Sequence, residues 1–201
     1  MTTEELVPWL QSWLQACQDC FQHRLLFAGL QGSHQRGEAE ADSDVDLVVI
    51  LDDLHVSDLK IYRDLLNTLP SVRACGFLAG QQELQHWIRS DLFQFYYDTR
   101  PLYGDIQSLQ KLFTYQDIRQ AIHIGACNLY HAACHSYVFD EPAPALAALY
   151  KTSFFLLQAH VFLQPGRYVS TKRALLDVLA GEDRSILQTC LEKERLPFLP
   201  A

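Results

Sequence analysis

Residues 29–49 read Gly-Leu-Gln-Gly-Ser-His-Gln-Arg-Gly-Glu-Ala-Glu-Ala-Asp-Ser-Asp-Val-Asp-Leu-Val-Val. A turn of small residues, Gly32-Ser33, follows one apolar run, and two aspartates, Asp44 and Asp46, open the next. Side chains alternate between the two faces of a strand, so both carboxylates are predicted to point the same way, as ligands of Mg2+ would. The backbone of Gly32 and the hydroxyl of Ser33 can approach phosphate oxygens that larger side chains would keep away.

A plainer interpretation of this stretch is an ordinary turn followed by two solvated aspartates at the end of a strand. It does not explain why residues 47–51, apolar enough to be covered on both faces of a sheet, follow two acids on one side. Like charges repel each other, so a cation between the two carboxylates is expected. The sequence therefore predicts a site for phosphate and a divalent metal.

The stretch resembles the signature of the DNA polymerase beta-like nucleotidyltransferase superfamily. In that signature a Gly-Ser turn precedes a Ser-Asp-x-Asp-hydrophobic strand, commonly with an Arg-Gly between them. Here the turn is Gly32-Ser33, the link is Arg36-Gly37 and the strand is Ser43-Asp44-Val45-Asp46-Leu47. The resemblance implies a metal-dependent transfer of a nucleotide, with Ser43 either orienting the turn or touching phosphate. The implied nucleotide-binding residues are Gly32, Ser33, Arg36 and Ser43, and the implied metal ligands, which are also catalytic, are Asp44 and Asp46.

The family usually adds a third carboxylate on the strand after the next helix, where it completes the metal site or acts as a base. The corresponding stretch here, residues 72–78, contains no acid. Glu83, Asp91 and Asp98 are the nearby substitutes, and Asp98, which ends an apolar run, is the predicted third catalytic residue. The alternative for Asp98 is a strand-end or turn aspartate that makes a local hydrogen bond beside Thr99.

The periodicity of the chain predicts an α+β fold, in which a small mixed β-sheet with flanking helices precedes an all-helical bundle. Strands are predicted at 24–30, 44–51, 72–78 and 92–97, residues 101–104 finish the sheet, and helices are predicted at 4–23, 57–69, 116–139, 142–163, 170–179 and 185–191. This order resembles that of aminoglycoside adenylyltransferases. The resemblance implies a nucleotidyltransferase domain over residues 1–108 and a helical C-terminal domain over 109–201 that lines the nucleotide and acceptor cleft.

The composition is that of an ordinary globular protein, with 49% hydrophobic and 20% charged residues among 201. A net charge of -8 with only 16 Lys and Arg argues against a broad nucleic-acid footprint and suits a cationic acceptor. No apolar run is long enough for a membrane helix, which takes about 18 residues or more. The six cysteines lie mostly in apolar helical patterns without a secretory segment, which predicts reduced core residues and a cytoplasmic protein.

Together these features predict a Mg2+-dependent nucleotidyltransferase that moves a nucleoside monophosphate, AMP from ATP, to a small hydroxylated acceptor such as an aminoglycoside-like compound. The predicted partners are the nucleoside triphosphate and the acceptor, without extended nucleic acid or membrane, and a homodimer is compatible with the sequence. Two alternatives stay open. One is a catalytically impaired nucleotide-binding or regulatory protein of the same fold, and the other is a nucleotidyltransferase that modifies a partner protein, as in toxin–antitoxin pairs.

Overall fold

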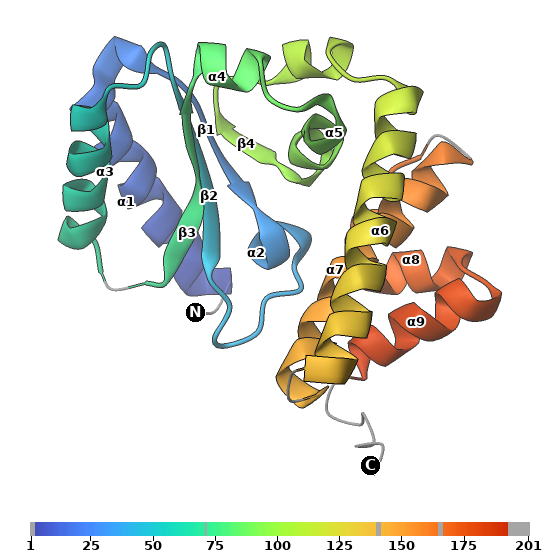
Figure 1. The fold of residues 1–201 in the computed structure, drawn as a ribbon. Coiled ribbons are helices and arrows are strands. Elements are labelled where there is room, and N and C mark those ends of the chain that lie inside the picture. The colour runs from blue at the N-terminus through green and yellow to red at the C-terminus, as the bar shows by residue number, and fades with distance from the viewer. Residues whose placement is uncertain (1–2, 71, 140–141, 165–166, 193–201) are drawn as a thin grey trace. The chain divides into compact units, whose positions relative to one another are not determined.

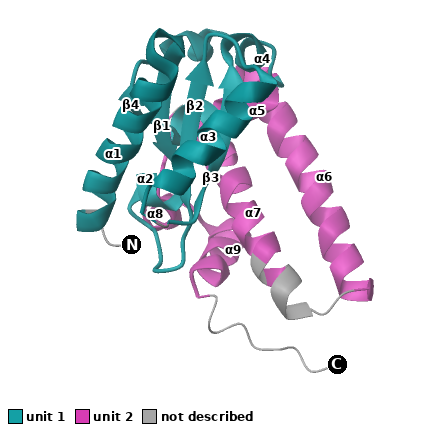
Figure 2. Cartoon of the chain, turned by 90° about the vertical axis from the view of Figure 1, so that its left-hand side faces the viewer, with its two compact units in different colours: residues 1–88, 95–112 teal, residues 89–94, 113–201 magenta. Residues whose placement is uncertain are grey.

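The computed structural model describes residues 3–70, 72–139, 142–164 and 167–192 (Figure 1). The chain divides into two compact units, one formed by residues 1–88 and 95–112 and the other by residues 89–94 and 113–201 (Figure 2). The first unit contains a mixed β-sheet with helices on it, and the second is helical. The fold class predicted from the sequence is therefore confirmed.

The sheet has four strands in the order β3-β2-β1-β4. β1 runs antiparallel to β2 and β4, whereas β2 and β3 run parallel and are joined through α3 (Val56–Thr68). In the register of the strands, Asp46 lies opposite Gln31 on one side and opposite Cys75 on the other. The last residue of β1 and the first residues of β2 and β3 therefore meet at one end of the sheet. The strand bounds are Leu25–Gln31 for β1, Val45–Leu51 for β2, Ala74–Gly80 for β3 and Arg100–Tyr103 for β4.

One face of the sheet packs against α1 (Thr3–Phe21) and α3, which Figure 1 shows on the same side of the strands. The period-two pattern of β2 delivers alternate side chains to this face, and α1 contributes its apolar stripe. Trp13 is completely buried there, and its indole Nε1 donates a hydrogen bond to the Tyr62 hydroxyl of α3 (3.3 Å). The buried residues of this core are Leu6, Trp9, Leu10, Trp13, Cys17, Phe21, Leu25, Ala28, Leu30, Val45, Leu47, Val49, Leu51 and Leu65.

Residues 92–97, predicted to be a strand, lie instead in the helix α5 (Arg89–Asp98). The run is rich in aromatic residues, which favour strands, but tertiary contacts select the helix. Phe93 packs against Phe162 and Tyr168, whereas Phe95 packs against Phe77 of β3. Residues two apart point to the same face of a strand but to nearly opposite sides of a helix, so only the helix serves both sets of contacts.

The second unit consists mainly of four helices that the sequence predicted, with shifted ends for three of them. These are α6 (Tyr115–Phe139), α7 (Pro142–Leu163), α8 (Lys172–Val178) and α9 (Gly181–Leu191). Its core includes Phe154, Leu175 and Leu187. The fully buried Gln158 amide of α7 donates hydrogen bonds to the carbonyls of Val169 (2.8 Å) and Ser170 (3.1 Å), which holds the segment before α8 against α7.

Three short elements were not predicted from the sequence: α4 (Gln81–Gln85), and the 3-10 helices η1 (Gln22–Arg24) and η2 (Gln107–Lys111). The prediction that the cysteines are core residues is confirmed for Cys17 and Cys190, which are buried, but is wrong for the other four. Cys20, Cys75, Cys127 and Cys134 are exposed. No helix among the described residues combines the length and apolarity needed to cross a membrane.

A guanidinium joins the start of β1 to the first turn of α3. Arg24 donates hydrogen bonds to both carboxylate oxygens of Asp58 (3.0 and 2.8 Å) and to the backbone carbonyl of Asp53 (2.7 Å). Asp58 is buried and also accepts a hydrogen bond from the backbone N–H of His55 (2.8 Å). The hydrogen bonds from Arg24, together with that from His55, lower the pKa of Asp58 to about 2 although burial acts in the opposite direction.

This depressed pKa predicts acid sensitivity. A group with a lower pKa in the folded state stabilises the protein above its unfolded pKa and loses that contribution as the pH falls through the folded pKa. The free energy of unfolding should therefore decrease between pH 4 and pH 2. Asp58→Asn should lower it by about 2 kcal/mol at pH 7 and flatten this pH dependence, because hydrogen bonds to a charged partner are lost. Urea unfolding at each pH measures both effects.

The matched control is Asp64→Asn on the same helix, where the carboxylate is exposed and bonded to Lys60 (2.5 Å). An exposed ion pair contributes little, so this variant should unfold like the wild type. Equal acid sensitivity in the Asp58→Asn variant and the wild type would contradict the assignment.

Candidate nucleotide and metal site

The Gly-Ser turn forms the start of the short helix α2 (Gly32–Arg36), which follows directly on β1. The side chain of the N-cap residue Gln31 makes no capping hydrogen bond, and the first backbone N–H of the helix, that of Gly32, donates instead to the carboxylate of Asp98 (3.3 Å). The helix ends at Gly37, whose left-handed backbone (φ 70°) lets the N–H groups of Gly37 and Glu38 bond back to the carbonyls of His34 and Ser33. The turn is thus a closed, well-defined loop whose N-terminal end lies at the end of the sheet.

Gly32 lies against the carboxylate of Asp46. Its backbone is left-handed (φ +73°), and a Cβ placed there would lie 1.9 Å from Asp46 Oδ2. Any larger residue at position 32 would therefore be strained and would collide with the carboxylate. The structure confirms that the Gly-Ser turn and the second aspartate of the signature meet in space, although 14 positions separate them in the sequence.

Asp44 lies immediately before β2, outside the strand in which it was predicted. Its Oδ1 is 2.9 Å from Nε of Arg73, in the segment that leads into β3. The two groups form an ion pair without the alignment of a good hydrogen bond, and Arg73 donates instead to the backbone carbonyl of Asp42 (3.0 Å). A divalent metal bound by Asp44 would have to compete with this guanidinium for the carboxylate.

Asp98 lies on the other side of Gly32. It is buried at the C-terminus of α5, and its Oδ2 accepts a hydrogen bond from the backbone N–H of Gly32 (3.3 Å). Nη1 of Arg36 donates to both of its carboxylate oxygens (2.8 and 2.7 Å). The structure therefore brings Asp98 to the Gly-Ser turn, at the end of a helix and in a tight ion pair, and its role as the third catalytic carboxylate stays a prediction.

Burial and ion pairing have opposing effects on the pKa values of Asp98 and Arg36. Burial raises the pKa of Asp98, and the hydrogen bonds from Arg36 offset only part of that effect. For Arg36, burial lowers the pKa, but the interactions with Asp98 and Glu38 raise it overall. The side chain of Arg36 is only 6% exposed, because Asp98 and Glu38 (3.3 Å) surround its guanidinium. The positive charge that the sequence assigned to phosphate is thus directed at these two carboxylates.

Ser43 closes the loop that leads to the aspartates. Its hydroxyl accepts a hydrogen bond from the backbone N–H of Glu40 (2.8 Å), and its own N–H donates to the Glu40 carbonyl (3.1 Å). These bonds hold the turn over residues 40–43, and both roles that the sequence left open for Ser43, orienting the Gly-Ser turn and touching phosphate, stay predictions. The turn over residues 40–43 sets the direction in which the chain enters β2.

The structure locates the acid-free strand and the three substitutes for a third carboxylate. Cys75 of β3 lies opposite Asp46, and at the next position Gly76 (φ +136°) packs so tightly on Leu47 that a Cβ would lie 1.9 Å from its carbonyl oxygen. Glu83 follows the far end of β3, roughly 16 Å of strand away from Cys75. Asp91 is exposed on the first turn of α5, in the residues that belong to the second unit. Asp98 alone of these acids bonds to the Gly-Ser turn.

Buried polar atoms without a hydrogen bond lie in the same segment, although one of them, Asp44 Oδ1, forms the ion pair with Arg73. Among the described residues, four buried side-chain nitrogen or oxygen atoms have no hydrogen bond, and three of them are His34 Nε2, Gln35 Oε1 and Asp44 Oδ1. Such atoms in a native protein usually mark a missing water, ion or ligand. No three or more His, Cys, Asp and Glu side chains within the described ranges form a metal-binding group. Asp44 and Asp46 fit Mg2+, which is commonly bound by one or two carboxylates together with substrate phosphates.

The sequence did not indicate that Arg73, Gln31 and Thr99 take part in this site. Gln31 Nε2 donates to the Thr99 hydroxyl (2.5 Å), which ties the end of β1 to the residue after Asp98. Neither this contact nor the Arg73–Asp44 ion pair leaves a signal in the sequence, because each joins segments that are about 30 or more residues apart.

Comparisons with known proteins agree with this geometry. A family model described as a nucleotidyltransferase domain matches residues 14–101. The crystal structure of spectinomycin adenyltransferase AAD(9) from Enterococcus faecialis with ATP and spectinomycin is similar, with a TM-score of 0.56 and 15% identity over 92% of this chain and 88% of that chain. A toxin–antitoxin crystal structure with AMP-PNP aligns at a TM-score of 0.39 and 19% identity, covering 58% of this chain and 89% of that chain. No curated protein sequence matches the chain.

The family match spans α1 from Leu14, the whole Gly-Ser turn, both aspartates and the beginning of β4. The similarity to the adenyltransferase, at this level of identity, extends the shared fold over most of both units. Residues 14–101 therefore match the family model of a nucleotidyltransferase domain, which agrees with the resemblance to the DNA polymerase beta-like nucleotidyltransferase superfamily that the sequence motif carries.

Proposed function

We propose that the protein is a Mg2+-dependent enzyme that transfers a nucleoside monophosphate, AMP from ATP, to a hydroxyl group of a small acceptor. The observation that carries this proposal is the contact of Gly32 with Asp46, which places the start of α2 beside a carboxylate proposed to bind the metal. Phosphate oxygens at α2 and a metal at Asp44 and Asp46 would then share one small volume. ATP as a substrate and free cysteines both suit the cytoplasm, which is part of the proposal.

The metal supplies charge neutralisation of the triphosphate and polarisation of the reacting phosphorus centre. The residues of the chain have separate tasks in this scheme. Asp44 and Asp46 hold the metal, and Gly32 and Ser33 bind the β and γ phosphates through the backbone and a hydroxyl. Arg36 and Asp98 do not reach the nucleotide in this proposal, and their ion pair instead keeps the turn in place.

The acceptor is proposed to be a cationic, hydroxylated small molecule of the aminoglycoside kind. The net charge of -8 raises the local concentration of cations near the protein. The similar adenyltransferase structure contains spectinomycin, and this compound is named for that protein and not for the present chain. The homodimer that the sequence allows stays a prediction.

A second candidate function is nucleotide binding without transfer. It is favoured by β3, in which Cys75 and not an acid lies opposite Asp46, and by Asp98, whose oxygens are both bonded to Arg36. A regulatory protein or a partner of a toxin would need only the binding half of the site. The two candidates differ in one measurable property, the release of pyrophosphate.

The direct test is pyrophosphate release from ATP and Mg2+ in the presence of a panel of hydroxylated amines. We expect release with at least one acceptor, and a loss of about 100-fold or more for Asp44→Asn and for Asp46→Asn, since each removes a metal ligand. ATP binding in calorimetry without pyrophosphate release would favour the second candidate. Absence of both binding and release, with these variants indistinguishable from the wild type, would reject the proposal.

The contact of Gly32 with Asp46 is tested by a pair of alanine variants. Gly32→Ala and Gly37→Ala impose nearly the same backbone strain, because the φ angles are +73° and +70°. Only at position 32 does the new Cβ meet a carboxylate, since nothing lies within 4 Å of a Cβ at Gly37. We expect both variants to lose similar stability, and Gly32→Ala alone to weaken Mg2+–ATP binding by about tenfold or more.

Calorimetry with Mg2+–ATP and thermal unfolding of the same samples separate the two effects. Equal nucleotide affinity of the two variants would show that Asp46 and the turn do not act together.

The role of Asp98 is tested by Asp98→Asn, with Asp91→Asn on the same helix as the exposed control. If Asp98 is a positioning residue, we expect Asp98→Asn to bind Mg2+–ATP more weakly and to have a KM for ATP raised several-fold. Its free energy of unfolding should fall by about 3 kcal/mol, because Arg36 is left buried without its partner. If Asp98 is a general base, we expect Asp98→Asn to leave ATP binding unchanged and to reduce kcat by about 100-fold or more. Steady-state kinetics and calorimetry on both variants distinguish these outcomes.

A further inference from the structure

A histidine nitrogen beside the Gly-Ser turn is buried without a hydrogen bond. His34 is the third residue of α2 and directly follows Ser33. Among the residues that the structure describes, its Nε2 is buried and has no hydrogen-bond partner. Such an atom costs free energy, and in a native protein it usually marks the place of a water, an ion or a ligand. The proposed function has so far given this side chain no task.

The backbone of the turn is fixed, but the imidazole is not held through Nε2. The His34 carbonyl accepts a hydrogen bond from the N–H of Gly37 (3.3 Å), and the Ser33 carbonyl accepts one from the N–H of Glu38 (2.8 Å). The residue as a whole is half-buried, so part of it is in contact with solvent. Rotation about χ1 and χ2 would bring Nε2 toward a ligand and would break no hydrogen bond of this atom.

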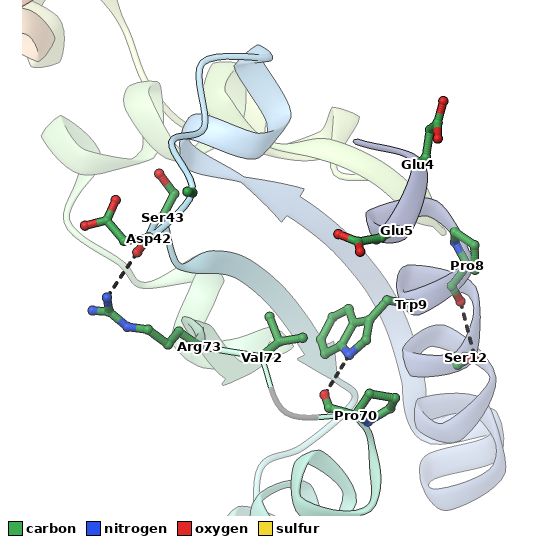
Figure 3. A pocket seen from close by; sticks show the side chains of 11 residues that line it. Glu4, Glu5, Pro8, Trp9, Ser12, Asp42, Ser43, Pro70, Val72 and Arg73 are labelled. Carbon is green, nitrogen blue, oxygen red and sulfur yellow. Dashed lines mark hydrogen bonds between the residues drawn. The ribbon is translucent and has the colours of Figure 1, made fainter. Parts of the chain in front are cut away.

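The arginines near the turn are already engaged. Nη1 of Arg36 donates to both carboxylate oxygens of Asp98 (2.8 and 2.7 Å). Arg73, in the lining of the pocket that Figure 3 shows, donates to the Asp42 carbonyl (3.0 Å). Its Nε also pairs with Asp44 (2.9 Å). A triphosphate at the turn would gain little from these two guanidinium groups, whereas Nε2 of His34 is still unpaired.

The chemistry of the unpaired nitrogen matches a phosphate oxygen. A neutral imidazole with its proton on Nε2 donates one hydrogen bond there, and phosphate oxygens accept such bonds strongly because they are charged. The next residue provides a contrast. Gln35 Oε1 is also buried without a partner, but it is an acceptor and cannot bond to a phosphate oxygen. Of these two atoms, only His34 Nε2 fits the phosphate chain.

We propose that His34 is a phosphate-binding residue of the nucleotide site, and that its Nε2–H donates a hydrogen bond to an oxygen of the β or γ phosphate. Without ligand, Nε2 is unpaired, and rotation of the ring on binding gives it an acceptor. This inference rests on the proposed position of the triphosphate at Gly32 and Ser33. His34 takes no part in the chemical step, so binding measurements test its role.

His34→Leu separates a ligand-binding role from a structural one. The variant removes an unsatisfied buried atom, so without ligand it should be at least as thermally stable as the wild type. It should bind Mg2+–ATP about tenfold more weakly, because a hydrogen bond to a charged acceptor is lost. His34→Gln retains a side-chain N–H donor and should therefore stay within about threefold of the wild-type affinity.

Gln35→Leu is the matched control, since it removes the other unpaired atom from the same turn. We expect its affinity for Mg2+–ATP to equal that of the wild type. Calorimetry with Mg2+–ATP and thermal unfolding of the ligand-free samples measure both properties. Equal affinity of His34→Leu and the wild type, or equal weakening in His34→Leu and Gln35→Leu, would overturn the proposal. Lower stability of ligand-free His34→Leu would also overturn it, because Nε2 would then have a structural role.

Imidazole NMR spectra test which part of the ligand His34 contacts. The His34 signals are assigned by their loss in His34→Gln, and each titration contains Mg2+ but no acceptor. Tripolyphosphate and ATP should each shift the His34 Nε2 signal saturably, whereas AMP, which lacks the β and γ phosphates, should leave it unchanged. A comparable shift with AMP, or no shift when ATP is bound, would overturn the assignment.

These measurements separate this inference from the transferase proposal. A protein that binds ATP through His34 but releases no pyrophosphate with any acceptor would support the inference while the transferase proposal failed. Pyrophosphate release together with unchanged Mg2+–ATP affinity of His34→Leu would overturn the inference and leave the transferase proposal intact.

Discussion

The site depends on the absence of a side chain at Gly32. The backbone of this residue touches the Asp46 carboxylate on one side and donates its N–H to Asp98 on the other. A Cβ would exclude Asp46 from this position, and the left-handed backbone would strain any other residue. The contact is possible because β1 and β2 pair in the register that sets Gln31 opposite Asp46. The sheet thereby delivers the turn and the second aspartate to one place.

The arginines of the site are used mainly to organise carboxylates. Arg36 is held by Asp98 and Glu38, and Arg73 is paired with Asp44. In the proposed reaction, neutralisation of the triphosphate would thus rest on the metal and on backbone N–H groups.

Much of the fold could be predicted from local pattern, and the errors have identifiable causes. The amphipathic helix α1, the strands around the Gly-Ser turn and the helices α6 and α7 each carry a periodicity that a single segment reveals. α5 was misassigned because its aromatic residues favour a strand, whereas Phe93 and Phe95 pack against different partners on opposite sides of a helix. The exposure of Cys75 and Cys134 was missed because an apolar neighbourhood in sequence does not fix which face a residue occupies.

The sequence by itself carried the resemblance to the nucleotidyltransferase superfamily and singled out the two aspartates, because a Gly-Ser turn and an Asp-x-Asp strand at this spacing form a local signature of residue types and distances. Only the tertiary structure decided what each of these residues touches. Asp98 reaches Gly32 across 66 positions, and Arg73 reaches Asp44 across 29, through the pairing of strands and the docking of α5. Such contacts arise from the packing of elements whose own patterns carry no record of their partners, so these ion pairs and hydrogen bonds appear only once the chain is folded.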